Sequence, residues 1–402
     1  MLPPPESITA SSSRPSLNIT LVNTWRVVNA KGGTEKVFCN LANALVQRGH
    51  KVTAICLDKE QGAPGFPIDE RIRFINAYNS KVPLTLSKAA RKLRALSFSK
   101  RKRQTNRAVL EAEIPVRKLS KIISTATSDV IVSFQVESTY ALKKIVGQKV
   151  PIVTMLHGHP SVYCDKLSIP GVKDAVESSA VVQVLRPEFV ECLLAYYPLA
   201  NAKVIPNCVP QFSEIAELKK KTVINVARLS PEKRQVLLTK AFALIKDQFP
   251  DWNLEFWGEL HVNTQFTAEL EKTIKECGVE DRVHLCGATS DVPKQLERAS
   301  IFAFPSEFEG WGLALTEAMS IGLPAIGCKE CPAVNTLIRD EENGLLCDDT
   351  PESLAAALSR LMSDESLRIR FGKAAKEDMK KYAPDRIWDQ WENLLLSLTE
   401  SK

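Results

Sequence analysis

The chain has 402 residues, of which 44% are hydrophobic and 25% are charged, and its formal net charge is +6. This length exceeds one ordinary hydrophobic core, so we expect a globular protein with two domains of roughly 150–200 residues each. The sequence holds no run of 18 apolar residues, and its ten cysteines lack the dense spacing of a secreted scaffold. A membrane-spanning helix and a disulfide framework are therefore both disfavoured.

The N-terminal residues favour a cytosolic protein. Residues 1–16 begin Met-Leu-Pro-Pro-Pro-Glu and lack the basic and then apolar pattern of a signal peptide. We expect these residues to form a disordered tail.

A first domain is expected over residues 17–206, with strands and helices in alternation. Residues 17–22 are a predicted strand, Gly32 and Gly33 open a predicted helix, and residues 51–57 are the next strand. This βαβ unit is parallel and right-handed by strong default. Further buried strands are predicted at residues 129–134, 151–156, 181–185 and 202–205.

Positive charge is concentrated in residues 81–121, where thirteen Lys or Arg and two acidic residues give a local balance of +11 and leave −5 for the rest of the chain. Apolar and basic residues take opposite sides of a helix between residues 86 and 96, which favours adsorption to an anionic membrane at about 1 kcal/mol per basic residue. A solvated surface helix is the alternative. Nucleic acid is disfavoured because this stretch has only Phe98 for base stacking. The predicted membrane contacts are Lys88, Arg91, Lys92, Arg101, Lys102 and Arg103.

Residues 207–221 are predicted to be a linker, and a second strand and helix series follows over residues 222–383. A last segment, residues 384–402, is expected to form a helix that packs back across the domain junction. Two α/β domains in tandem imply a ligand cleft between their sheet edges. The predicted strands of the second domain are residues 222–227, 254–257, 283–286, 301–304 and 325–327, and the predicted helices lie near 235–249, 266–277, 312–321, 351–362 and 386–398.

Two candidate sites follow strands of the first domain. Gly32 and Gly33 can present backbone amides to a phosphate or an acceptor, but they are not the G-x-G-x-x-G fingerprint, so nicotinamide binding finds no support. His157 can donate to a sugar hydroxyl or a phosphate. With His159 it can equally form a metal pair or a packing pair of the loop.

Two more candidate sites follow strands of the second domain. Arg228 and Lys233 place two cations at one strand end, where they can neutralise a diphosphate, although a surface ion pair with Glu232 is the alternative. Glu309 and Glu317 stand eight positions apart around a Gly-x-Gly turn that leads into an apolar helix. The backbone amides near Gly312 and Leu313 can bind a phosphate, and the two carboxylates can bind hydroxyls. The alternative is that the two glutamates lie on a solvent-exposed helix face without a function. These four sites together suit a sugar linked to a diphosphate.

Metal binding is not expected. The chain contains no Asp-x-Asp pair to hold a divalent ion on a diphosphate, so protein cations would have to do the neutralising. Its one C-x-x-C, formed by Cys328 and Cys331, has no second pair at zinc-finger spacing, and we predict buried, unreactive thiols there.

The spaced set of motifs resembles the family 4 retaining glycosyltransferases, whose GT-B architecture is a pair of Rossmann-like α/β domains with parallel sheets facing a central cleft. The resemblance runs from about residue 17 to residue 398. Its motifs are residues 226–233 (Val-Ala-Arg-Leu-Ser-Pro-Glu-Lys), 304–306, 309–313, 317–319, 322–324 and 343–346, and more loosely 32–37, 157–158 and 204–207.

The resemblance implies a role for each matched residue. Arg228 and Lys233 would stabilise the departing diphosphate, Glu309 would contact hydroxyls of the donor sugar, and Glu317 would contact the ribose. His157 would lie near the reacting carbon, and Gly32, Gly33, Gly312 and Leu313 would also line the donor site. One departure is Gly258-Glu259-Leu260-His261, where the family often has Gly-x-Gly, which puts contacts to the base or distal phosphate there in doubt.

The expected function is therefore metal-independent, retaining transfer of a sugar, most readily from a UDP-sugar, to a glycan or a polyprenyl-diphosphate-linked saccharide, as in polysaccharide or lipopolysaccharide synthesis. No cofactor is expected, and the protein is expected at the cytoplasmic face of a membrane. The alternatives are a sugar-nucleotide epimerase or a phosphorylase of the same fold, or a non-catalytic membrane scaffold that binds sugar nucleotides.

Overall fold

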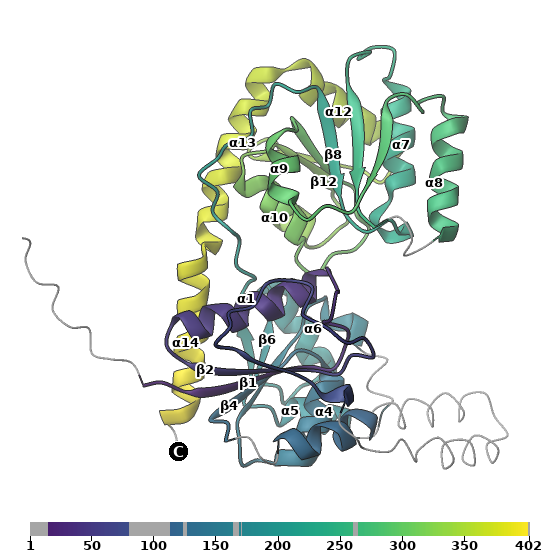
Figure 1. The fold of residues 1–402 in the computed structure, drawn as a ribbon. Coiled ribbons are helices and arrows are strands. Elements are labelled where there is room, and N and C mark those ends of the chain that lie inside the picture. Colours follow the sequence, from purple (N-terminus) through teal and green to yellow (C-terminus); the bar gives the residue numbers. More distant parts are fainter. Residues whose placement is uncertain are drawn as a thin grey trace, which may run out of the picture. The chain divides into compact units, whose positions relative to one another are not determined.

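The computed structural model describes residues 15–79, 113–123, 127–163, 169, 171–259 and 264–400. These residues form two compact units. The first comprises the described residues up to Ile205 together with those from Trp388 onward, and the second comprises those of Pro206–Ile387. Each unit is a parallel β-sheet with helices on both faces (Figure 1).

The first sheet has seven parallel strands in the order β3-β2-β1-β4-β5-β6-β7. Six of them confirm predicted strands, whereas β3 was not predicted, because a four-residue edge strand with an exposed first residue carries little hydrophobic signal. The strands are β1 Asn18–Asn23, β2 Lys51–Cys56, β3 Arg73–Asn76, β4 Val130–Ser133, β5 Ile152–Met155, β6 Val181–Val184 and β7 Ala202–Val204.

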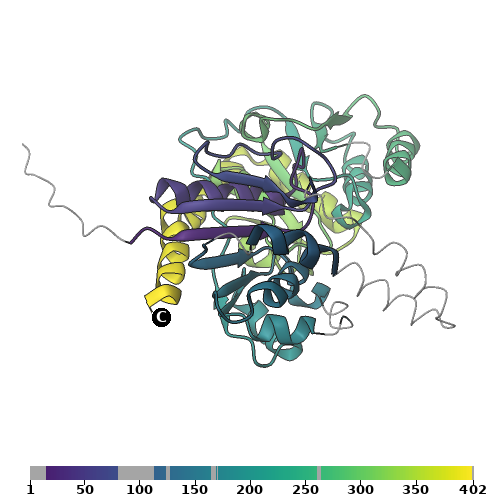
Figure 2. The same cartoon turned by 60° about the horizontal axis from the view of Figure 1, so that its bottom comes forward.

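Helices cover both faces of this sheet, with α1 on one face and α4 and α5 on the other (Figures 1 and 2). Residues 113–123 are also helical, and Leu119 and Ile123 of that helix pack on Val22, Ile55 and Ile131 of the sheet. The helices are α1 Gly33–Gln47, α4 Val136–Val146, α5 Val172–Glu177 and α6 Glu188–Tyr196, and Ala77–Asn79 is a short 3-10 turn.

The second sheet has six parallel strands in the order β10-β9-β8-β11-β12-β13. Five confirm predicted strands, and the edge strand β13 was recognised only as a motif. Its strands are β8 Thr222–Val226, β9 Asn253–Trp257, β10 Val283–Gly287, β11 Ile301–Phe304, β12 Ala325–Cys328 and β13 Gly344–Cys347.

The main core of this unit lies between the second sheet and α7, α8 and α12. Helix α13 was not predicted, and it packs against α10, where Gly372 approaches Gly322 so closely that a Cβ on Gly372 would lie 2.1 Å from the Gly322 oxygen. The helical segments are η3 Pro231–Lys233, α7 Gln235–Leu244, α8 Thr264–Glu276, α9 Val292–Glu297, α10 Leu313–Ser320, α11 Val334–Leu337, α12 Pro351–Ser363, α13 Glu365–Met379, η4 Lys380–Tyr382 and α14 Pro384–Glu400.

Helix α14 confirms the predicted final helix, and within the first unit it is tied to the end of α1. His50 accepts a hydrogen bond from the Leu17 amide through Nδ1 at 3.2 Å, and its Nε2 lies 3.4 Å from Glu392 of α14. Arg48 contacts Glu392 and Asp389 at 3.5 and 3.3 Å. These side chains join the amino ends of β1 and β2 to the C-terminal helix.

Each sheet has a switch point, where the strand order reverses and the loops of two neighbouring strands diverge. In the first sheet it lies between β1 and β4, and in the second between β8 and β11. Ligands of open parallel sheets bind at such points, beyond the carboxyl ends of the strands.

The predicted tail and basic segment lie largely outside the described residues. Residues 1–14 and 80–112 are not described, and these include all six predicted membrane contacts. Among the residues that are described, no helix is both long and apolar enough to cross a bilayer.

Candidate functional site

The loop after β8 begins at Ala227 and runs through a short 3-10 turn into α7. Gln235, the first residue of α7, is fully buried and donates through Nε2 to the Arg228 carbonyl at 2.9 Å. Asn225, near the end of β8, donates to the Ala303 carbonyl of β11 at 2.8 Å. Neither amide side chain was predicted, although a polar residue at the end of an apolar strand indicates a buried hydrogen-bonding group.

The loop after β11 carries Glu309 and ends at Gly312, which precedes α10. Gly312 has a left-handed backbone, φ 80°, which a side chain would strain, and no side chain caps the helix that starts at Leu313. Gly312 therefore offers no side chain to the first amides of this eight-residue helix. Such a terminus suits an anion.

The two loops meet through a partly buried ion pair. Lys233 Nζ lies 2.6 Å from Glu309 Oε1, and only 13% and 12% of the two side chains are exposed. The Glu307 amide also donates to the Glu232 carbonyl at 2.9 Å. An ammonium has three protons, so Lys233 keeps two for phosphate oxygens after its bond to Glu309.

Arg228 and Glu317 differ in exposure. Arg228 is 65% exposed and lies 3.7 Å from Glu232, the surface pair weighed from the sequence; such a pair is weak enough to leave the guanidinium available. Glu317 is only 4% exposed on the inner side of α10. The solvated helix face considered for Glu317 is therefore wrong.

Gly258, the first residue of the segment that departs from the family motif, lies where two backbones approach closely. A Cβ at this position would lie 2.0 Å from the Ala227 carbonyl oxygen, so the ends of β8 and β9 can approach only with glycine there. Leu260 and His261 lie outside the described residues.

In the first unit, Gly32 caps α1, and Gly33 is its first residue. His157 follows β5, stacks on Phe134 with ring centroids 5.1 Å apart, and donates its backbone amide to Tyr163 at 3.1 Å. Both ring nitrogens are shielded from solvent without a hydrogen-bond partner in the described part of the chain. Burial lowers the pKa of His157 to about 4, with the Phe134 backbone opposing, so the ring is neutral at pH 7.

His159 supports the packing alternative for the His-x-His pair. Its ring packs edge-on against Phe189, 5.0 Å away, and its Nδ1 lies 2.7 Å from the Ser161 hydroxyl. Cys328 and Cys331 are both buried, as predicted. The described residues hold no group of three or more His, Cys, Asp or Glu placed to bind a metal.

A polar network at the first switch point was also missed. Gln135, just after β4, donates to Asn23 Oδ1 at 2.7 Å and accepts from the Thr24 amide at 3.0 Å. Asn23 Oδ1 also accepts from the Trp25 amide at 2.9 Å. These bonds hold the start of the β1 loop, from which Trp25 projects with 49% of its surface exposed.

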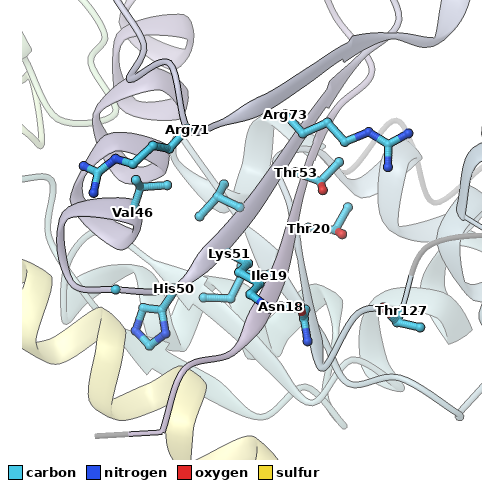
Figure 3. Close-up of a pocket in the computed structure, with 12 residues that line it drawn as sticks. Asn18, Ile19, Thr20, Val46, His50, Lys51, Thr53, Arg71, Arg73 and Thr127 are labelled. Atoms are coloured by element: carbon cyan, nitrogen blue, oxygen red, sulfur yellow. The ribbon is translucent and has the colours of Figure 1, made fainter. Parts of the chain in front are cut away.

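A separate pocket of about 500 Å³ lies at the opposite, amino edge of the first sheet (Figure 3). Its polar groups are largely engaged. Arg71 is bound by Asp69 at 2.6 Å, and Asn18 by Asp129 at 3.0 Å. Lys51 and Arg73, also in the lining, are exposed on the surface. We assign this pocket no part in the chemistry.

Comparison with known proteins agrees with this fold. One family model, Glycosyltransferase Family 4, matches residues 31–211, and another, Glycosyl transferases group 1, matches residues 211–378. An uncharacterized glycosyltransferase of Haemophilus influenzae is 26% identical over 376 residues, which are 92% of this chain and 97% of that protein. The crystal structure of Anabaena HepE in complex with UDP and glucose has a TM-score of 0.71 and 18% identity and covers 94% of this chain and 99% of its own.

One relative has a more specific name. The N-acetylgalactosamine-N,N'-diacetylbacillosaminyl-diphospho-undecaprenol 4-alpha-N-acetylgalactosaminyltransferase of Campylobacter jejuni is 29% identical over 190 residues, which are 47% of this chain and 50% of that protein.

Two parallel α/β units with these matches define a glycosyltransferase of GT-B fold. Between them the two family models account for residues 31–378, and the chain belongs to the family 4 glycosyltransferases.

Proposed function

We propose that the protein transfers a sugar from a UDP-sugar to a glycan or polyprenyl-diphosphate-linked acceptor, with retention of anomeric configuration and without a metal. The observation that carries the proposal is the partly buried pair of Lys233 and Glu309 beside the start of α10, at the switch point of the second sheet.

The leaving diphosphate needs positive charge, because negative charge grows on it as the glycosidic bond breaks. Lys233 supplies a fixed ammonium, Arg228 a movable guanidinium, and the first amides of α10 supply partial positive charge. These groups would take the place of a divalent ion. The proposed sugar transfer therefore does not require a metal ion.

The acids suit hydroxyl binding better than proton transfer. Glu309 already accepts a hydrogen bond from Lys233 Nζ through Oε1, and its carboxylate oxygens can also accept from sugar hydroxyls. Glu317 is proposed to contact the ribose and neutral His157 the donor sugar, while the leaving phosphate accepts the proton of the acceptor on the same face. Gly32 and Gly33 remain proposed donor contacts.

The acceptor proposal rests on the relatives and on charge. The Campylobacter relative is named for a diphospho-undecaprenol acceptor, and HepE was solved with UDP. The basic segment at residues 81–121 would bring the enzyme to the cytoplasmic surface of an anionic membrane, where such an acceptor resides.

Donor preference provides the direct test. UDP is expected to raise the unfolding temperature more than GDP or ADP, and saturation to 100 times its dissociation constant would add about 2.7 kcal/mol of stability. UDP release from the preferred UDP-sugar should then require an acceptor. Acceptor-independent turnover would favour an epimerase, sugar phosphate formation with inorganic phosphate would favour a phosphorylase, and no nucleotide binding would favour a scaffold.

Membrane adsorption is tested separately by vesicle sedimentation. More protein is expected to pellet with vesicles containing anionic lipid than with neutral vesicles, and added salt should weaken this difference. A matched variant with Lys88, Arg91, Lys92, Arg101, Lys102 and Arg103 changed to Gln should lose it. Equal pelleting with both vesicle types would exclude electrostatic adsorption.

A further inference from the structure

Arg234 follows Lys233 and has an unusual backbone conformation. Its φ of 55° and ψ of 35° are left-handed, a region that glycine adopts freely and other residues rarely do. It ends the 3-10 turn Pro231–Lys233 and immediately precedes α7. Because this backbone conformation is strained for arginine, contacts of the side chain are expected to maintain it.

The Arg234 guanidinium reaches two carboxylates on other loops. Nη1 lies 2.5 Å from Oδ2 of Asp349, after β13, and Nη2 lies 3.6 Å from Oε1 of Glu307, after β11. Since the strand order runs β8-β11-β12-β13, this one side chain joins the loops of β8, β11 and β13 along the carboxyl edge of the sheet.

The pair of Arg234 and Asp349 is partly shielded from water, with 21% and 32% of the side chains exposed. Burial would raise the pKa of Asp349, yet Arg234, together with the Cys328 thiol, holds it below its usual range. Asp349 and Glu307 both lie beside the Arg234 guanidinium, so its charge faces carboxylates of two protein loops.

Lys233 therefore lies between two anchored residues. On one side, the carbonyl of Glu232 accepts from the amide of Glu307. On the other side, Arg234 is fixed by Asp349. This anchoring directs the Lys233 ammonium toward Glu309 at 2.6 Å.

We propose that Arg234 is a positioning residue that, through Asp349 and Glu307, holds Lys233 ready for the diphosphate of the donor. The inference rests on the proposed sugar transfer and adds a residue that need not touch the substrate. Preorganised charge stabilises a transition state because it need not reorient during the reaction.

Two variants test this role. Arg234→Gly removes the side chain while suiting the left-handed backbone, and Asp349→Asn removes its partner without altering the β8 loop. Each is expected to lower kcat by about ten- to a hundredfold, because small displacements of a charge from the reacting atoms have such effects. The donor KM should change much less. The double variant should be no worse than the poorer single variant, since both remove one interaction.

The matched control is Arg360→Ala, which breaks an ion pair with Glu341 on the exposed surface of the same unit. This variant should retain wild-type kcat, and unfolding temperatures of all variants identify any that fail to fold. Impairment in Arg234→Gly but not in Asp349→Asn would show direct contact with the donor and overturn the proposal. Multiplying effects in the double variant, or unchanged kcat in Arg234→Gly, would also overturn it.

Failure of sugar transfer itself is distinguishable. If the wild type transfers no sugar, the proposed function fails, and calorimetric UDP affinity then tests the positioning. Both variants should weaken binding of free UDP by the same factor, because UDP carries the leaving-group charge that the intact donor lacks, and unchanged UDP affinity in both would overturn the role of Arg234.

Discussion

Lys233→Ala is expected to lower kcat/KM by about 10²–10³-fold, a loss of about 2.7–4 kcal/mol of transition-state stabilisation. Lys233 is the least exposed cation of the proposed donor site and lies where the diphosphate would gain charge. Steady-state UDP release, measured with the preferred donor and a saturating acceptor, gives this ratio. Because the lost contact strengthens in the transition state, kcat itself should fall.

Lys272→Ala is the matched control, because this lysine of α8 is 74% exposed and pairs with Glu276 of the same helix. Its kcat/KM should equal that of the wild type. Lys233→Ala also leaves Glu309 nearly buried without its cation, so the unfolding temperature of Lys233→Ala is measured beside its activity to separate destabilisation from catalysis. Activity of Lys233→Ala within a few-fold of wild type, in fully folded protein, would refute the assignment.

His157 is expected to make the protein less stable as the pH falls from about 6.5 to about 4. Its folded pKa of about 4 lies below the ordinary value of 6.5, so the unfolded chain binds more protons in this window. Each pKa unit corresponds to about 1.4 kcal/mol, and the full loss is on the order of 3 kcal/mol. Chemical unfolding at pH 7.5, 6 and 5 measures this slope.

His157→Gln should remove this contribution and flatten the slope, because glutamine does not titrate. Exposed His284 of β10 gives the control variant His284→Gln, which should keep the wild-type slope. Burial, with a contribution from Arg186, also lowers the pKa of His159, so some slope should remain. A His157→Gln slope equal to that of the wild type would show that His157 is not protonated on unfolding.

Local sequence patterns predicted the sheets well where strands are central and apolar. Strands such as β4 and β5, buried at every position, follow from continuous hydrophobic runs. The edge strands β3 and β13 and helix α13 were not predicted as such, because a short edge or a polar helix has a weaker periodic signal. Most strands of both sheets could therefore be predicted from the sequence, because hydrophobic runs mark segments that are buried in a parallel sheet.

Candidate residues at strand ends were also predictable, but their partners were not. Lys233 and Glu309 were assigned from separate motifs, and only the neighbouring positions of β8 and β11 brought them within 2.6 Å. Arg234 was not among the predicted site residues. Its partner Asp349 lies after β13, and no local pattern links the two.

By itself, the sequence determined the α/β class, the two domains and the strand ends that carry Lys233, Glu309 and His157, because hydrophobic period and turn residues are local properties. The tertiary structure alone decided that Lys233 and Glu309 form one partly buried pair, that Arg234 joins three loops, and that the His157 ring nitrogens are shielded. These features depend on strand order and on solvent exclusion by residues distant in sequence, and no local segment carries that information.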